Sequence, residues 1–380
     1  MKAKNFFLVL TSLSMITWSC TSESDLANSK TLSDTSLASS KSLKSSITAN
    51  AQSLQTAVSS IMSTDGYKLL SANTSSSSVK MGVNSYYQPF DTVAVTYGLA
   101  DVAGVWDYKA ALNYRHRVPL NSFFQKSTTE TSADFILRLP DSKIKHPWDL
   151  LHSTPADTLL TNNYVVDVSK YNRWFQQFAP GRYNWSYEMN SNIKVNDLAI
   201  GDLRILSTND KTKGYNFSST FGFSNGYTAN TTYTDGDTIK SVYNISKDGQ
   251  ILYLEKYTGV RPTNYGSHPE RYYSLIIGNV EIDRKGGPNS LDSAKVYLGG
   301  VLQTKAKVEM ITVSTTSTET TIIKKSRTIQ ITFDDGTVTT VKELLGSTIT
   351  DIDTIFTSIR QAYFATNIVD NVSYYIYTKK

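Results

Sequence analysis

The stretch that decides the fold class is residues 215–234, which read YNFSSTFGFSNGYTANTTYT. Aromatic and small apolar side chains alternate here with Asn, Ser and Thr, and a period of two is typical of β-strands with one buried face. An Asn-Gly pair interrupts the alternation and predicts a hairpin turn. A three-residue loop over residues 224–226 is favoured, because it pairs Phe223 with Tyr227 and keeps the aromatic side chains on one face.

The same reasoning predicts a second hairpin. Residues 247–249, Lys-Asp-Gly, would form a three-residue turn that pairs Ile245 with Ile251. This pairing would again set apolar side chains opposite each other.

A third hairpin is predicted where Asp335-Gly336 would form a two-residue turn and set Phe333 against Val338. Further strands are expected near residues 133–139, 164–168, 272–283, 294–300 and 306–313. The sequence therefore predicts a mainly β protein, built as one or more antiparallel meander sheets or as an open barrel.

Two helices are expected beside the strands. Apolar residues recur at helical spacing over residues 43–66, which predicts an amphipathic helix near the amino terminus. Residues 352–363 carry a second stripe, which Thr350 would cap. Residues 372–377 predict a final strand that returns to the sheet. The β-rich body would cover residues 83–380, as one elongated domain or as two domains split near residue 200.

The first residues of the chain have the pattern of an export signal. Lys2 and Lys4 precede a mostly apolar run over residues 6–18, which is followed by Ser19 and Cys20. A helix of this length spans only about 20 Å, which is short of the ~30 Å hydrocarbon core of a membrane. The run is therefore interpreted as a signal peptide and not as a membrane-spanning helix.

This arrangement resembles the precursors of bacterial cell-envelope lipoproteins, a class that includes many members without an assigned activity. The resemblance implies a signal peptide over residues 1–19, acylation of Cys20 with palmitate or similar chains, and a membrane partner reached through them. Thr21, rather than Asp, follows the Cys, so the resemblance implies attachment to the outer membrane, at its periplasmic face or at the cell surface. Residues 20–42 contain no aromatic side chain and are expected to form a flexible tether.

The charge balance excludes one class of partner. The chain is 19% charged with a formal net charge of +5, and loss of Lys2 and Lys4 with the signal peptide would lower this charge to +3. Such mild basicity over a long chain predicts no nucleic-acid partner.

Sequence motifs for catalysis are weak. Gly222 to Gly226 match the G-x-S-x-G pattern of serine hydrolases, but that motif requires a strand followed by a helix, and here it joins two predicted strands. The four histidines, His116, His146, His152 and His268, lack the spacing of a zinc site. No glycine-rich nucleotide motif occurs. We therefore expect a protein that is not an enzyme and has no cofactor or metal, with a hydrolase as the least favoured alternative.

The densest aromatic stretch lies between residues 171 and 187. Trp174, Tyr183 and Trp185 are candidates for stacking against a ligand, and packing in the core is the competing interpretation. The function expected from these observations is binding of a glycan or a hydrophobic ligand. The alternative is an envelope-assembly or adhesion component that acts through protein–protein contacts.

Overall fold

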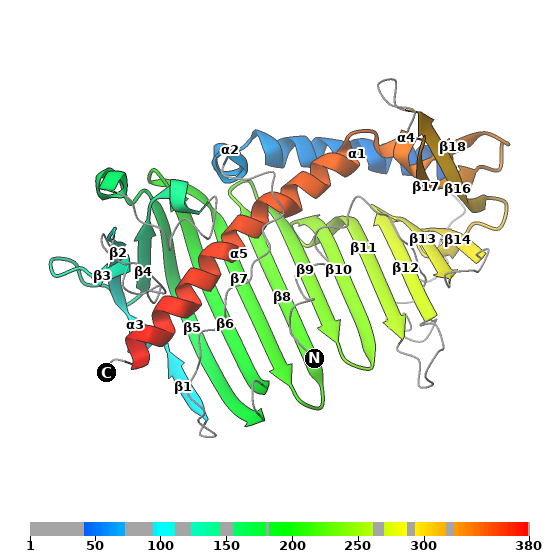
Figure 1. Cartoon of the computed structure of the whole chain (residues 1–380). Coiled ribbons are helices and arrows are strands. Elements are labelled where there is room, and N and C mark those ends of the chain that lie inside the picture. Colours follow the sequence, from blue (N-terminus) through cyan, green and yellow to red (C-terminus); the bar gives the residue numbers. More distant parts are fainter. Residues whose placement is uncertain are drawn as a thin grey trace. The chain divides into compact units, whose positions relative to one another are not determined.

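The fold class predicted from the sequence is confirmed in a computed structural model, which describes residues 42–72, 94–110, 123–144, 155–179, 182–260, 270–286, 293–316 and 323–378 (Figure 1). Most strands form a large antiparallel meander that is not closed, and helices lie near both ends of the chain. Cys20, the predicted signal peptide, almost all of the predicted tether and the four histidines lie outside the described residues.

The chain divides into two compact units. Of the described residues, the first unit contains those within Ser60–Ala229 and Ile352–Lys380, and the second contains residues 42–59 together with those within Asn230–Asp351. The larger part of the second unit, Asn230–Asp351, is thus inserted in the sequence between two parts of the first.

The first unit is built on long antiparallel strands in the order β8-β7-β6-β5-β4-β2-β3, in which only β2 and β4 are parallel. β4 pairs with the first half of β5, and β1 pairs with its second half. The strands are β1 (Val95–Gly98), β2 (Gly104–Tyr108), β3 (Phe124–Lys126), β4 (Phe135–Leu139), β5 (Tyr164–Ala179), β6 (Arg182–Val195), β7 (Leu198–Asp210), β8 (Gly214–Phe223) and the start of β9 (Tyr227–Asp235). Short helices in this unit are α2 (Asp65–Ala72), α3 (Leu99–Val102), η4 (Asp141–Lys143) and η6 (Pro155–Leu159).

A bulge explains why β5 is much longer than the predicted strand at 164–168. The register between β5 and β6 shifts between Val168 and Lys170, so that Val168 pairs with Ser191 and Tyr171 pairs with Met189. Alternate residues of β6 share a face, so Val168 and Tyr171 share one as well, although three positions separate them. The bulge keeps both side chains in the core, where each is at most 1% exposed.

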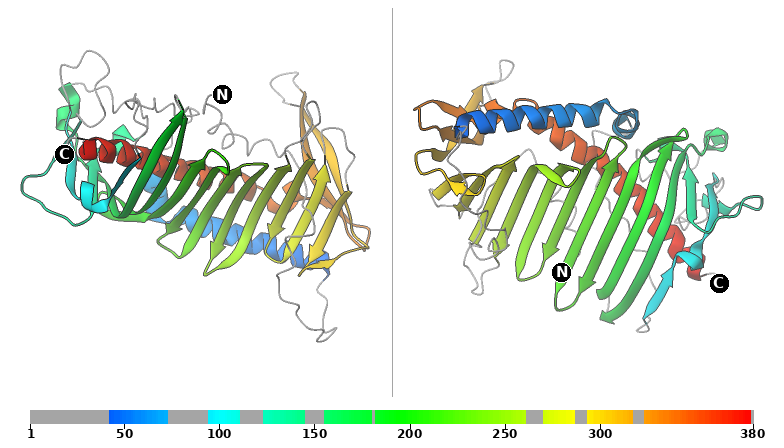
Figure 2. Two further views of the ribbon diagram at one scale, coloured as in Figure 1. Left: turned by 90° about the horizontal axis from the view of Figure 1, so that it is seen from below. Right: turned by 180° about the vertical axis from the view of Figure 1, so that it is seen from behind.

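Helix α5 (Thr348–Thr378) lies against one face of β5 and its neighbours (Figure 2). Its apolar residues are buried at helical spacing: Ile352, Ile355, Phe356, Ile359, Ala362, Ile368, Val369 and Val372. The prediction of a final strand over residues 372–377 is wrong, because these residues continue the helix. Thr350, the predicted cap, is already inside it.

The second unit contains consecutive antiparallel meander strands and a small separate sheet. The meander strands are β10 (Thr238–Lys247), β11 (Gln250–Val260), β12 (Glu270–Ile277), β13 (Val280–Gly286), β14 (Ser293–Leu298) and β15 (Val301–Leu302). The small sheet is β16 (Lys307–Thr316), β17 (Ile323–Thr332) and β18 (Val338–Thr340). Helix α4 (Val341–Leu345) follows directly, capped by the side chain of Thr340.

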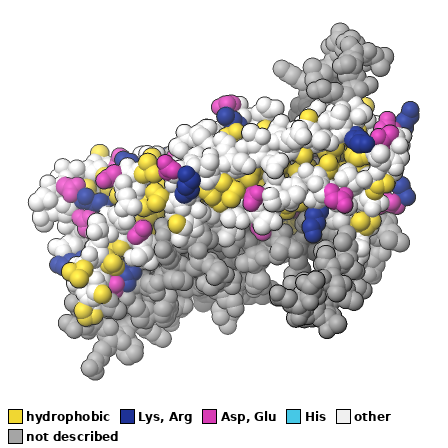
Figure 3. Space-filling view, turned by 90° about the horizontal axis from the view of Figure 1, so that it is seen from above, with side chains coloured by type: hydrophobic (Ala, Val, Ile, Leu, Met, Phe, Trp, Pro, Cys, Tyr) yellow, Lys and Arg dark blue, Asp and Glu magenta, His cyan; other side chains and the backbone are white. Residues whose placement is uncertain are grey.

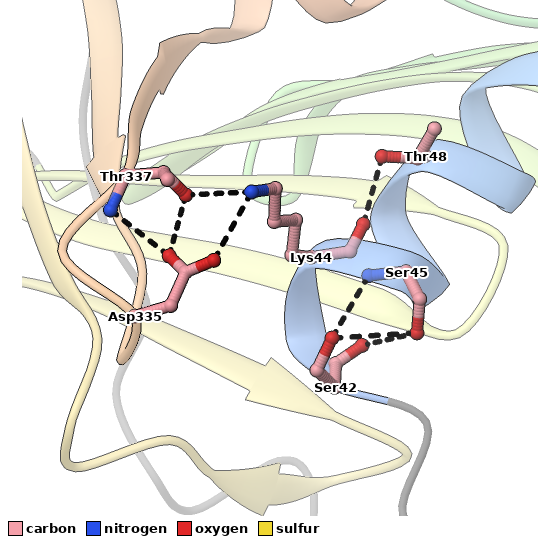
Figure 4. Close-up of polar contacts among 6 residues, drawn as sticks. All are labelled: Ser42, Lys44, Ser45, Thr48, Asp335 and Thr337. Atoms are coloured by element: carbon pink, nitrogen blue, oxygen red, sulfur yellow. Dashed lines mark hydrogen bonds and ion pairs between the residues drawn. The ribbon is translucent and has the colours of Figure 1, made fainter.

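Helix α1 (Leu43–Ser63) confirms the predicted amino-terminal helix, which α2 follows after one residue. Its first turn is fixed by polar contacts in the second unit (Figure 4). The backbone N–H of Ser45 donates to the hydroxyl of Ser42 (3.2 Å), and the Nζ of Lys44 lies 3.1 Å from a carboxylate oxygen of Asp335. The hydroxyl of Thr337 accepts a second bond from Lys44 (2.9 Å).

The loop between β8 and β9 has the three residues that the sequence predicts, 224–226. Gly226 adopts a left-handed φ of +83°, and its N–H donates to the carbonyl of Phe223 (3.0 Å). Glycine accepts this conformation without the clash that a Cβ would cause.

The turn between β10 and β11 differs from the prediction. Asp248 and Gly249 both have positive φ (50° and 80°) and form a two-residue turn. A bulge beside it pairs Ile245 with Tyr253 in place of Ile251, which is 37% exposed. The predicted pairing of Ile245 with Ile251 is therefore wrong. The bulge shifts the register, so that Ile245 still faces a buried apolar partner although the turn is shorter than predicted.

The prediction for the turn before β18 is also wrong, but here the turn is longer than predicted. It has three residues, 334–336, in which Gly336 has a φ of +79° and donates to the carbonyl of Phe333 (3.0 Å). Val338 pairs with Thr332 instead of Phe333, and the two predicted partners differ in exposure, 3% for Phe333 and 54% for Val338.

Candidate ligand-binding surface

The three predicted stacking residues do not share one face of the sheet. Trp185 pairs with Phe175, whose ring contacts Tyr374 of α5 at 5.7 Å. Directly paired residues lie on one face, so Trp185 is on the face that α5 partly covers. Trp174 precedes Phe175 and pairs with Ser186, so its side chain is on the opposite face. Trp174 and Trp185 therefore cannot contact the same small ligand.

Tyr183 lies on the same face as Trp185. It is two residues away on β6, and it pairs with Gln177 of β5. The pKa of Tyr374 on α5 is raised by burial and by the nearby Tyr183 hydroxyl. The structure thus brings Tyr183 and Trp185 together beside α5.

A third aromatic residue, Tyr215 of β8, completes this group. Asn209 of β7 pairs with Trp185 on one side and with Tyr215 on the other, and the two rings have centroids 5.6 Å apart at 53°. All three aromatic side chains are partly exposed. We call Tyr183, Trp185 and Tyr215 the aromatic row.

Arg173 flanks the aromatic row. Its guanidinium carbon lies 5.3 Å from the centre of the Trp185 ring and 5.8 Å from that of Tyr187, distances typical of cation–π contacts. Its Nε lies 3.3 Å from Oδ1 of Asp370 on α5. The side chains of Arg173 and Asp370 are 16% and 33% exposed, so this ion pair reaches solvent at the edge of α5.

Asp370 also links the sheet to α5 through a tyrosine. The Tyr171 hydroxyl donates to Oδ1 of Asp370 (3.0 Å) and lies 2.5 Å from the hydroxyl of Ser373. Tyr97 of β1 stacks on Tyr377 at 4.7 Å between ring centres. These contacts hold the end of α5 on β1 and β5.

The electrostatics keep this group in one protonation state at neutral pH. Burial raises the pKa of Tyr171 and Tyr187 well above its usual value, and the Asp370 carboxylate raises both further. Burial disfavours the charge on Arg173, but Asp370 and the tyrosines offset this, and the pKa of Arg173 is raised. The tyrosines are therefore neutral and Arg173 is a cation.

Trp174 lies on a polar face. It pairs with Thr96 of β1 and Ser186 of β6, and Glu188 in the next row accepts from Asn172 (3.2 Å) and pairs with Lys170 (2.7 Å). These groups satisfy each other, and both cross-strand partners of Trp174 carry hydroxyl groups rather than rings. The better candidate site is the aromatic row.

Sequence reasoning missed Tyr215, Arg173 and Asp370 as members of the site. The alternation of residues 215–223 predicts which face of the sheet carries Tyr215. It does not predict the contact of Tyr215 with Trp185, which lies two strands away. Arg173 lies within the aromatic stretch, and its positive charge among aromatic residues could have indicated a place in the site. Asp370 lies beyond the predicted helix, in a segment whose structure was not predicted.

Other site chemistries have no support among the residues that the structure describes. Within these ranges no group of His, Cys, Asp and Glu side chains could hold a metal ion, and no helix is long and apolar enough to cross a membrane. Figure 3 shows Lys and Arg interspersed with Asp and Glu on the face that it presents. Gly222–Gly226 joins two strands, so its Ser224 lacks the helix that a nucleophile elbow requires.

In comparisons with known proteins, no family model, curated protein or solved structure matches the chain. The fold and the site define it as an open antiparallel β protein that carries a partly exposed aromatic row beside a carboxy-terminal helix.

Proposed function

We propose that the protein is a non-enzymatic binding protein of the cell envelope, and that the aromatic row binds a glycan or a hydrophobic ligand. The observation that carries this proposal is the setting of Trp185. Its ring is partly exposed and is flanked by Tyr215 and by the guanidinium of Arg173.

Such a setting favours binding because the side chains are already ordered. Trp and Tyr offer a large apolar surface with few rotatable bonds, so little side-chain entropy is lost when a ligand packs on them. The row stands on three paired strands, which are more rigid supports than loops. Sugar rings and flat apolar molecules both present C–H surfaces that suit aromatic partners.

The test compares two tryptophans on opposite faces. Trp185→Ala should weaken binding to any ligand found on a glycan array or in a fluorescent fatty-acid displacement assay by about tenfold or more, because it removes the central ring of the row. Trp174→Ala is the matched control and should leave the affinity within about twofold. Circular dichroism and thermal unfolding of both variants check that they are folded.

Two results would count against the proposal. One is an equal affinity of wild type and a folded Trp185→Ala variant for the same ligand. The other is a loss of binding in Trp174→Ala but not in Trp185→Ala, which would move the site to the opposite face.

We also propose that acyl chains on Cys20 anchor the protein to the outer membrane. The support is the sequence alone, in which the only cysteine lies two residues after the end of the apolar run. One acyl chain holds a protein only marginally, and two or three hold it stably. Cys20→Ala should therefore release the protein from the membrane fraction and abolish incorporation of labelled palmitate. Retention of both by the variant would refute the anchor.

A further inference from the structure

The ion pair beside the aromatic row leaves hydrogen-bonding groups available. Oδ1 of Asp370 receives both the Arg173 contact and the Tyr171 hydroxyl. Among the described residues, no further hydrogen bond is found for Oδ2 of Asp370 or for the terminal amino groups of Arg173. Within the described part of the chain, an acceptor and several donors therefore remain at this ion pair. The guanidinium of Arg173 lies over the Trp185 ring, and both side chains of the pair are partly exposed.

The charges of this pair cancel. Among the described residues, the largest electrostatic effect on Arg173 comes from Asp370, and smaller ones come from Tyr171, Tyr97 and Tyr187. An anionic ligand would be attracted by Arg173 and repelled at similar distance by Asp370. A purely apolar ligand would cover both charged groups without replacing their bonds to water, which is unfavourable. The pair suits an uncharged ligand with hydroxyl groups.

We propose that the ligand of the aromatic row is an uncharged sugar with two adjacent ring hydroxyls. One hydroxyl accepts from a terminal amino group of Arg173, the other donates to Oδ2 of Asp370, and the C–H surface of the ring packs against Trp185. Planar Arg and carboxylate groups present the directional donors and acceptors that such a diol requires. This inference rests on the proposed binding function and selects the glycan over the hydrophobic ligand.

The first experiment uses the wild-type chain and matched sugars. Oligosaccharides that end in glucose or galactose are compared with those that end in the corresponding uronic acids, and with analogues in which one of the two adjacent hydroxyls is replaced by hydrogen. The neutral sugar should bind at least about tenfold more tightly than its uronic acid. Deoxygenation should cost about tenfold, because it leaves a charged group without its partner.

The second experiment changes the charge balance. Asp370→Asn keeps the shape but leaves Arg173 as an uncompensated cation, so affinity for the neutral sugar should fall about tenfold and the preference should reverse toward the uronic acid. Glu188→Gln, on the opposite face, is the control and should change neither value.

The outcomes separate the two proposals. If Trp185→Ala abolishes binding but the wild type prefers uronic acids, or ignores deoxygenation, the diol inference is refuted while the binding site stands. If only the fluorescent fatty acid binds through Trp185, the inference is refuted as well. If Trp185→Ala changes no binding at all, the proposed function fails and this inference fails with it.

Discussion

Tyr171 connects a strand of the sheet with α5 through a single hydroxyl group. Its ring is 1% exposed, and its hydroxyl meets both Asp370 and Ser373. Removal of a buried hydroxyl leaves its partners without a hydrogen bond, and water cannot reach them to supply another. Contacts of this kind set the position of Asp370, and through Asp370 the position of Arg173 beside the aromatic row.

Tyr171→Phe should therefore lower the free energy of unfolding by about 1–3 kcal/mol, as measured by urea denaturation. Tyr183→Phe is the matched control, because Tyr183 is partly exposed, and its cost should stay within about 0.5 kcal/mol. Equal stabilities of wild type and Tyr171→Phe would show that the hydroxyl contributes nothing to the docking of α5.

At the scale of elements, the sequence predicts strands well and turns less well. Alternation identifies the strands because it depends only on neighbouring residues. Turn length depends on one residue more or less, and a bulge such as the one beside Ile245 compensates for a shorter turn. The turn at 248–249 is therefore one residue shorter than predicted, and the turn at 334–336 is one residue longer.

The error at residues 372–377 has a different cause. Residues 372–377, Val-Ser-Tyr-Tyr-Ile-Tyr, are rich in β-branched and aromatic side chains, which are typical of a strand. In the structure this segment is helical and is buried through Val372 and Ser373, each 0% exposed.

The site was only partly predictable from the sequence. Tyr171 and Asp370 lie 199 residues apart, and no local sequence pattern indicates that they meet.

The hairpin turn before β18 gives a prediction for acid pH. The hydroxyl and backbone N–H of Thr337, together with Lys44, hold the pKa of Asp335 at about 2, below its ordinary value of 3.8. A lowered pKa in the folded state adds stability above the unfolded value, and this contribution is lost as pH falls. Asp335→Asn should therefore lower the thermal midpoint at pH 6, and the difference from wild type should shrink as pH falls below about 4 and vanish only below about pH 2.

Asp334→Asn is the control in the same turn, since none of these contacts involves Asp334. It should behave like wild type at both pH values. A difference between wild type and Asp335→Asn that is as large at pH 2 as at pH 6 would contradict the argument.

At the scale of the whole molecule, the first unit is completed by a segment from the far end of the chain. Its strands end at β9, and the residues of the second unit intervene before α5 begins. The apolar side of α5 is buried along most of its length. The helix is therefore a structural part of the first unit, although it is distant in sequence.

A chain truncated after Gly346 should expose the sheet face that α5 covers. We expect increased binding of the dye anilinonaphthalene sulfonate and a lower thermal midpoint than in the full chain, because the apolar partners of α5 become accessible to water. The full chain is the reference. Unchanged dye binding and unchanged midpoint in the truncated chain would show that α5 does not cover an apolar face.

The late position of α5 also affects how the protein is made. Translation proceeds from the amino terminus. The hydroxyl of Tyr171 therefore cannot form its hydrogen bond with Ser373 until 202 further residues have been synthesised. Until the 31 residues of α5 are synthesised, the apolar and aromatic side chains that α5 covers in the folded first unit stay exposed, and chaperones and proteases bind surfaces of this kind. A premature stop codon in this last segment would therefore yield an aggregation-prone product, and only full-length copies would escape quality control.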